Sequence, residues 1–145
     1  MLILPQSIAE QICAHAERDY PNECCGILLG SFSYGQWQLT SAISVGNVAS
    51  TPRNRYQIAP AQLVRIAREA SRQGLDIAGF YHSHPDHPAI WSQTDLAEAH
   101  WLGCLYLIFE LRNGKTTAGN AFLLTGDSEE EKHFVQIPMT IEPAP

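Results

Sequence analysis

The sequence predicts an α+β domain in which a mixed β-sheet packs against about three helices. Three observations predict this class. Two segments carry apolar residues at three- and four-residue steps, which is typical of amphipathic helices. Several short apolar runs bounded by turn residues indicate strands. The two kinds of segment interleave without a regular strand–helix repeat, which favours a mixed sheet over a wholly parallel one.

The chain length and composition indicate one domain over residues 1–145. A chain of 145 residues that is 45% hydrophobic and 17% charged can build one packed core. Nine basic against fifteen acidic residues give a net charge of −6, which argues against a nucleic-acid partner. No apolar run approaches the roughly 20 residues that cross a bilayer, and no signal peptide is recognisable at the start. We therefore expect a cytoplasmic protein without a membrane partner.

The sequence pattern in the first half of the chain predicts two helices separated by strands. The first helix covers residues 6–19 and ends at the turn formed by Tyr20, Pro21 and Asn22. Residues 23–32 form a buried apolar strand, residues 37–48 form one or two strands, and residues 56–58 are a further candidate strand. The second helix covers residues 60–73, with Gly74 at its C-terminal cap.

The second half predicts a strand, a short helix and a hairpin. The strand at residues 76–81 runs directly into a histidine-rich segment. Ser92 and Asp95 stand three apart, as in the acidic form of a capping box, so a helix begins at Ser92. Residues 104–111 and 116–124 flank an Asn113-Gly114 turn and form a hairpin, and a weaker strand covers residues 134–141.

The segment from His82 to Asp95 carries the most informative chemistry. His82 and His84 lie one residue apart at the end of a strand, so both side chains point to the same side and can bind one metal ion. Asp95, in the first turn of the next helix, can supply an oxygen ligand. Two histidines and one carboxylate leave a fourth position open, which is typical of a catalytic zinc site. A His-x-His pair alone is not specific, and the added Ser92 and Asp95 make the pattern informative.

The complete pattern resembles the JAMM motif of MPN-domain metalloproteases. In that motif His-x-His-Pro is followed at fixed offsets by a serine and an aspartate, and His82, Ser83, His84, Pro85, Ser92 and Asp95 match every offset. The family also has an upstream Glu-x-x-Gly-Leu/Ile-Leu-x-Gly segment, which the sequence ECCGILLG at residues 23–30 matches. The resemblance covers most of the chain and corresponds to a compact prokaryotic form with a cytidine-deaminase-like fold.

The resemblance implies a role for each matching residue. His82, His84 and Asp95 bind one zinc ion, Glu23 transfers a proton from the attacking water to the leaving amine, and Ser92 donates a hydrogen bond to the oxyanion. The implied substrate is the C-terminal Gly-Gly tail of a ubiquitin-like protein, in compact members a sulfur carrier. Hydrolysis of a peptide and of an isopeptide bond both remain open, as does the oligomeric state.

Two other functions remain as alternatives. The first is a non-catalytic MPN scaffold that binds a partner through the same surface, and the second is a zinc hydrolase of a non-protein amide. Among the remaining residues, His87 is expected to be an exposed side chain. Cys24 and Cys25 are adjacent in a strand and cannot both face the metal. The four cysteines are expected to be reduced, with a Cys25–Cys104 pairing left open; they are Cys13, Cys24, Cys25 and Cys104.

Overall fold

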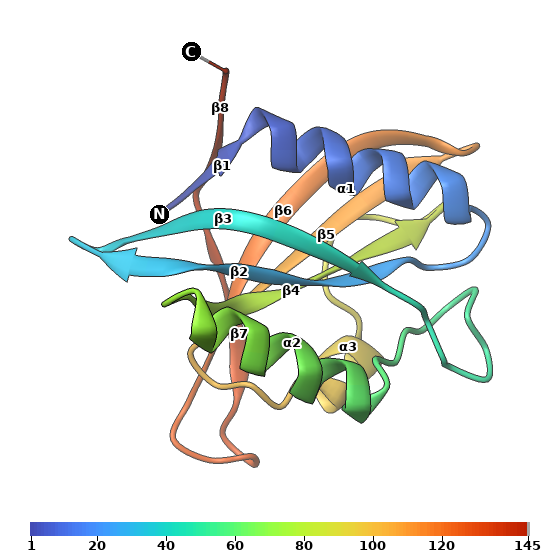
Figure 1. Cartoon of the computed structure of the whole chain (residues 1–145). Helices are drawn as coiled ribbons and strands as arrows, with labels where there is room; N and C mark the ends of the chain where they lie inside the picture. Colours follow the sequence, from blue (N-terminus) through green and yellow to red (C-terminus); the bar gives the residue numbers. More distant parts are fainter. Residues whose placement is uncertain (145) are drawn as a thin grey trace.

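The computed structural model describes residues 1–144, in which a mixed eight-stranded sheet packs against three helices (Figure 1). This confirms the predicted α+β class. The helices are α1 (Gln6–Asp19), α2 (Pro60–Arg72) and α3 (Gln93–Glu98). The strands are β1 (Leu2–Pro5), β2 (Cys25–Ser33), β3 (Gln36–Val45), β4 (Asp76–Pro85), β5 (Leu105–Arg112), β6 (Lys115–Thr125), β7 (His133–Ile137) and β8 (Met139–Glu142).

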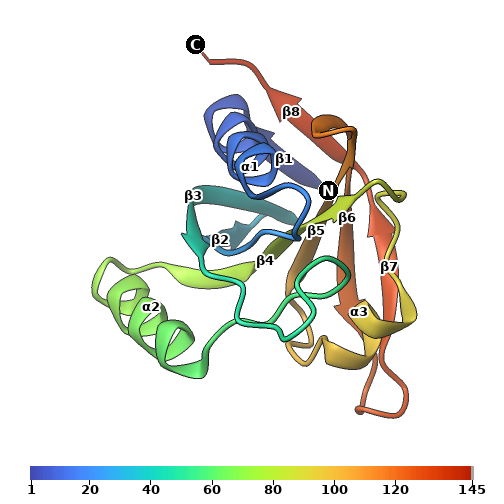
Figure 2. The ribbon, with the colours of Figure 1, turned by 90° about the vertical axis from the view of Figure 1, so that its right-hand side faces the viewer.

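The strand order is β7-β6-β5-β4-β2-β3-β1-β8. Strand β4 pairs in parallel with β5, and β1 pairs in parallel with β3 and β8, whereas the other pairs are antiparallel. Strands β7 and β8 lie at opposite edges although only Pro138 separates them in the chain. The sheet must therefore curve until its two edges approach each other, and Figure 2 shows β7 and β8 following one another along one side of the molecule.

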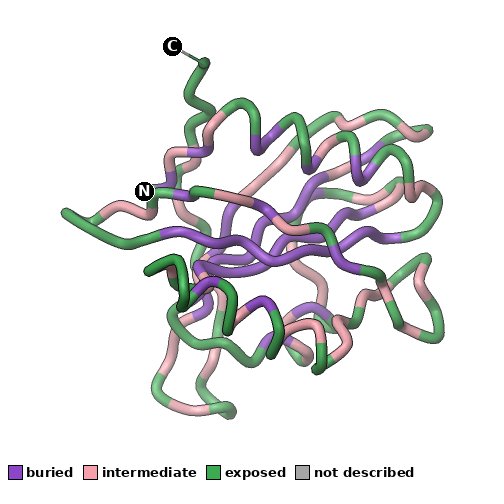
Figure 3. Tube along the Cα trace, in the orientation of Figure 1, coloured by how far each residue is buried: buried purple, intermediate pink, exposed green. Residues whose placement is uncertain are grey.

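Helix α1 covers one face of the sheet, and α2 and α3 lie on the other (Figure 1). Successive side chains of β4 point to opposite faces of the sheet. Tyr81 packs in the core beneath α1, and Phe80 packs in the core beneath α2. Burial is concentrated in the central strands (Figure 3). Cys24 and Cys25 point into these two different cores, as their adjacent positions predict.

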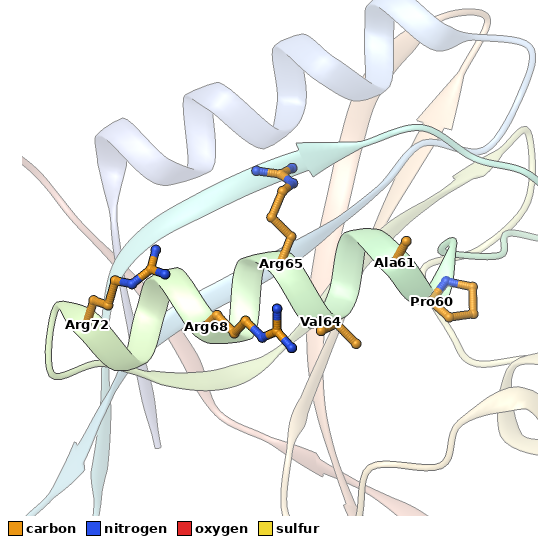
Figure 4. A pocket seen from close by; sticks show the side chains of 6 residues that line it. All are labelled: Pro60, Ala61, Val64, Arg65, Arg68 and Arg72. Carbon is orange, nitrogen blue, oxygen red and sulfur yellow. The ribbon is translucent and has the colours of Figure 1, made fainter.

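The outer face of α2 is basic and exposed. Arg65, Arg68 and Arg72 project from it along a shallow hollow of about 480 Å³ (Figure 4). Its inner face buries Ile66 and Ala70 against the sheet. This division explains why helical spacing of the apolar residues predicted the helix correctly.

The turn signals in the sequence are confirmed. Asn113 and Gly114 have φ values of 51° and 81°, as a tight hairpin between β5 and β6 requires, and Gly74 caps α2 with φ 72°. All four cysteines are free thiols within the described part of the chain. Across residues 1–144, no helix is long and apolar enough to span a membrane.

Two strand predictions need correction, and one further strand was not predicted. The single strand expected over residues 134–141 is wrong, because Pro138 has no N–H to donate and divides it into β7 and β8. Residues 56–58 form no strand; Tyr56 and Ile58 instead pack as irregular chain against the core beneath α2. Residues 2–5 form β1, which the sequence analysis missed; a four-residue strand is too short to show a period.

Candidate metal centre

The two histidines of β4 converge at the end of the strand. Both lie on the face that bears α2 and α3, and each side chain is 1% exposed. The Nε2 atoms of His82 and His84 are 3.2 Å apart. Parallel pairing with β5 continues through Pro85 and fixes the backbone on which both imidazoles stand.

Asp95 brings a carboxylate to the same point from α3. Its Oδ1 lies 3.2 Å from His82 Nε2, and its Oδ2 lies 3.0 Å from His84 Nε2. Burial alone would raise the pKa of this carboxyl, but the neighbouring imidazoles and the Ser92 N–H outweigh burial and hold the pKa well below its ordinary value. These contacts favour the ionised form of the carboxyl group, which is the form that binds a metal ion.

The donor set of His82, His84 and Asp95 fits a divalent metal ion. One ligand atom from each residue lies within 4.8 Å of the others, and all three residues are buried. The Nδ1–H of His84 donates to the Pro88 carbonyl at 2.7 Å, so its Nε2 keeps a free lone pair. Burial lowers the pKa of His82, which favours the neutral ring that a metal requires.

Ser92 fixes the position of Asp95. Its N–H donates to Asp95 Oδ2 at 2.9 Å, and its hydroxyl accepts from the Asp95 N–H at 3.0 Å, which completes the predicted capping box. One lone pair of Ser92 Oγ is thus used for the cap, while the hydroxyl hydrogen remains able to donate to another group.

Glu23 lies beside His84 although it stands 61 positions earlier in the sequence. One carboxylate oxygen is within 4.8 Å of a ring nitrogen of His84, and the residue is 1% exposed. Its Oε1 has no hydrogen-bond partner among the described residues. Burial, with a smaller contribution from the Asp95 charge, raises the pKa of Glu23 to about 9. A buried acid without a partner beside a metal-binding group is typical of a functional site.

The family model for prokaryotic homologues of the JAB domain, Prok-JAB, matches residues 5–131. The matched range contains both histidines, the aspartate, the serine and the glutamate. The chain belongs to the Prok-JAB family. This confirms the family expected from the sequence.

Three relatives of this Prok-JAB chain have descriptive names. It is 37% identical over 134 residues to a protein of Haloferax volcanii named "Desampylase", covering 90% of this chain and 92% of that protein. It is 32% identical over 129 residues to a Thermus thermophilus protein named "Probable TtuB-protein conjugate cleaving protease", covering 89% and 80%. It is 26% identical over 113 residues to a Mycobacterium tuberculosis protein named "CysO-cysteine peptidase", covering 78% and 75%.

Two solved structures share the fold of the Prok-JAB chain. A protein from Desulfitobacterium hafniense is 25% identical with a TM-score of 0.80, covering 99% of this chain and 95% of that one. A protein from Salinibacter ruber is 35% identical with a TM-score of 0.71, covering 98% and 92%. The similarity in each case extends over nearly the whole molecule.

The segment between β3 and α2 supports the site of the Prok-JAB chain in a way that the sequence analysis missed. The ring of Tyr56 stacks on His82 with centroids 4.4 Å apart. The side-chain amide of Asn47 donates to the carbonyls of Glu23 and Arg55, each at 3.0 Å. This irregular segment has no periodic pattern, so only an aromatic residue near an asparagine could have drawn attention to it.

A hollow of about 390 Å³ adjoins the metal centre of the Prok-JAB chain on the side of Tyr56. Its walls include Phe80, which stands two residues before His82 on the same face of β4, and Trp101 beyond α3. Phe80 and His82 lie roughly 6.6 Å apart along the extended strand, so the hollow borders the candidate metal centre.

Proposed function

We propose that this Prok-JAB chain is a zinc-dependent metallopeptidase or isopeptidase that hydrolyses the bond at the C-terminal Gly-Gly tail of a ubiquitin-like protein, in particular a sulfur carrier. One observation carries the proposal: two imidazoles and a carboxylate form a buried group, and a buried acid without a partner lies beside it. Metal-assisted hydrolysis of an amide needs both a group that binds the metal ion and a group that accepts a proton.

In this proposal His82 Nε2, His84 Nε2 and the Asp95 carboxylate hold the zinc ion. The bound zinc supplies a Lewis acid, which lowers the pKa of water to about 7 and makes it a nucleophile at neutral pH. His84 is oriented by its hydrogen bond to Pro88, and Asp95 is oriented by Ser92, so the ligands are held in place before zinc binds.

Glu23 acts as general base and then as general acid. Its carboxylate accepts a proton from the attacking water and passes that proton to the leaving nitrogen, which must be protonated to depart as an amine. The environment that raises the pKa of Glu23 makes its ionised form a stronger base than an exposed glutamate. A zinc ion at the neighbouring ligands favours that ionised form, because opposite charges attract.

Ser92 stabilises the transition state by donating its hydroxyl hydrogen to the oxygen of the carbonyl under attack. The capping bond to Asp95 N–H fixes the Ser92 side chain as an acceptor and leaves its hydrogen available. A hydrogen bond that is held ready for a developing oxyanion typically contributes about 3 kcal/mol to lowering the barrier.

The substrate class rests on the family and on the names of its members. The JAMM-like pattern implies a Gly-Gly tail of a ubiquitin-like protein, and one relative is named for cleaving protein conjugates and another as a peptidase. The matches cover 80% and 75% of the lengths of these two relatives. The products of the reaction are the carrier with a free terminal glycine and the released amine.

The direct test uses a ubiquitin-fold sulfur carrier whose terminal glycine is linked to a reporter, once by a peptide bond and once through a lysine side chain. The zinc-loaded parent is expected to cleave at least one of the two. The Glu23→Ala and His82→Ala variants should lose this activity, whereas the exposed substitutions Glu10→Ala and His133→Ala should not. If Glu23→Ala or His82→Ala cleaves as fast as the parent, the assigned site is wrong.

The same assay distinguishes the proposed enzymatic function from that of a non-catalytic scaffold. A scaffold would bind the carrier and leave both linkages intact. The position of the Glu23 carboxyl within 4.8 Å of a His84 ring nitrogen supports the enzyme, because a binding surface has no need of a buried carboxyl without a partner.

A further inference from the structure

A second group of possible metal ligands borders the first. Glu23, His84 and His87 each place one ligand atom within 4.8 Å of the others. His87, expected from the sequence to be exposed, is in fact half-buried, and its ring stacks on that of His84 with centroids 4.0 Å apart and an angle of 19°. The structure thus places a third imidazole at the metal centre.

The hydrogen bond of His87 leaves one ring nitrogen free to bind a cation. Its Nδ1 lies 2.9 Å from the carbonyl oxygen of Pro85, so the Nδ1–H donates and the Nε2 keeps its lone pair. His84 is oriented in the same way by Pro88. Histidines that bind metals commonly donate their other ring N–H to a backbone carbonyl.

The loop that carries His87 is anchored on both sides. Before it, Asp86 adopts φ 58° and its carboxylate accepts from the N–H of Asn113 at 2.8 Å. After it, the Ala89 N–H donates to Glu110 Oε1 at 3.1 Å, and the Ala89 carbonyl accepts from the Asn120 amide at 2.9 Å. The imidazole of His87 is therefore held beside His84 and does not need to be recruited from solvent.

Besides His87, Glu23 is the other ligand of this second metal position that the group of His82, His84 and Asp95 does not use. Its buried Oε1 has no hydrogen-bond partner among residues 1–144, so it can bind a cation without breaking a bond. The free lone pair of His84 already belongs to the group with His82 and Asp95. The second position thus has one carboxylate and one imidazole of its own, and a cation there would complete its coordination with solvent.

We propose that Glu23 and His87 form a second, weaker binding position for a divalent cation of the zinc class, and that filling this position inhibits hydrolysis. A Glu23 carboxylate bound to a cation cannot accept the proton of the attacking water. The inhibition rests on the function proposed above, whereas the binding of the second cation does not.

The experiment is a calorimetric titration of the metal-free full chain with zinc at fixed pH. The parent is expected to bind one equivalent tightly and a second equivalent more weakly. His87→Gln and Glu23→Gln should lose the weak step and keep the tight one. His133→Gln is the matched control, because His133 Nδ1 also contacts a carbonyl two residues earlier, that of Glu131 at 3.1 Å, but the residue is exposed.

Three results would overturn the proposal: a parent that binds only one equivalent in excess zinc, a weak step that survives in His87→Gln, or a weak step lost equally in His133→Gln. Asp95→Asn provides a reciprocal variant, since it should weaken the tight step and retain the weak one. This variant decides the question if His87→Gln fails to fold as judged by its circular dichroism.

Cleavage measured in excess zinc tests the inhibition separately. The ratio of the rate at ten equivalents of zinc to the rate at one equivalent should be well below one for the parent and close to one for His87→Gln. A parent that cleaves no conjugate at any zinc level would contradict the proposed function, and the titration would still decide whether the second position exists.

Discussion

The hydroxyl of Ser83 accepts a hydrogen bond of 2.8 Å from the backbone N–H of Cys24. Ser83 lies between the two histidines of β4, and Cys24 follows Glu23. The Ser83 N–H in turn donates to the Cys24 carbonyl at 3.2 Å. This reciprocal pair joins the strand that carries the histidines to the residue that positions the acid, so the middle residue of the His-x-His pattern has a structural role.

Replacing Ser83 by alanine is expected to destabilise the protein. Ser83 is fully buried, and the substitution leaves the Cys24 N–H without its partner, which costs about 1–3 kcal/mol. Urea unfolding measures the loss. Ser33→Ala, an exposed serine of β2, serves as the control and should change the free energy of unfolding little. Equal stabilities of Ser83→Ala and the parent would contradict the role assigned to this contact.

Zinc is expected to raise the melting temperature of the parent. A ligand at 100 times its Kd stabilises the folded state by about 2.7 kcal/mol. For a chain of this size that corresponds to a rise of about 5–10 °C. Thermal unfolding with and without a chelator measures the shift. His84→Ala should show little of it, because one of the three ligands is lost, and a full shift in that variant would exclude His84 as a ligand.

The metal-free protein is expected to lose stability through Glu23 as the pH rises. The pKa of Glu23 is about 9 in the folded state and near 4.5 when unfolded, so the stability linked to its protonated form is present below about pH 4.5 and declines toward pH 9. Glu23→Gln removes this dependence. Between pH 5 and pH 8, the parent should lose free energy of unfolding relative to Glu23→Gln.

The comparison with the variant is necessary because His82 acts in the opposite direction. Its lowered folded pKa means that stability is lost as the pH falls below the unfolded value of about 6.5. The difference between parent and Glu23→Gln cancels this contribution. A difference that is constant from pH 5 to pH 8 would show that Glu23 titrates normally.

Ser92→Ala is expected to lower both stability and activity. Loss of the cap costs about 0.5–2 kcal/mol, and loss of the hydroxyl donor should reduce kcat by about 10²–10³-fold. Ser92→Thr keeps a hydroxyl and should retain most of both. If Ser92→Ala loses stability but keeps its kcat with the carrier conjugate, Ser92 caps the helix and has no part in catalysis.

The local patterns of the sequence predicted the helices, the capping box at Ser92 and the hairpin at Asn113-Gly114. Each of these depends on residues within about four positions of one another, and such neighbours interact in any fold that contains the element. The His82–His84 pair and the Ser92–Asp95 box are each local in this sense, but residues 86–92 form a loop between them, so their connection was predicted only from the JAMM-like offsets. Glu23, far from these residues in the sequence, was predicted only from the resemblance of residues 23–30 to the upstream segment of the JAMM family.

The sequence by itself therefore determined the helices and the main strands, and it supplied His82, His84 and Asp95 as candidate metal ligands, which the structure brings together. The tertiary structure alone decided that Tyr56 stacks on His82, that His87 lies against His84, and that β7 and β8 occupy opposite edges of the sheet. These relationships depend on strand order, register and loop path, which arise from packing across the whole chain and leave no periodic signal in any one segment.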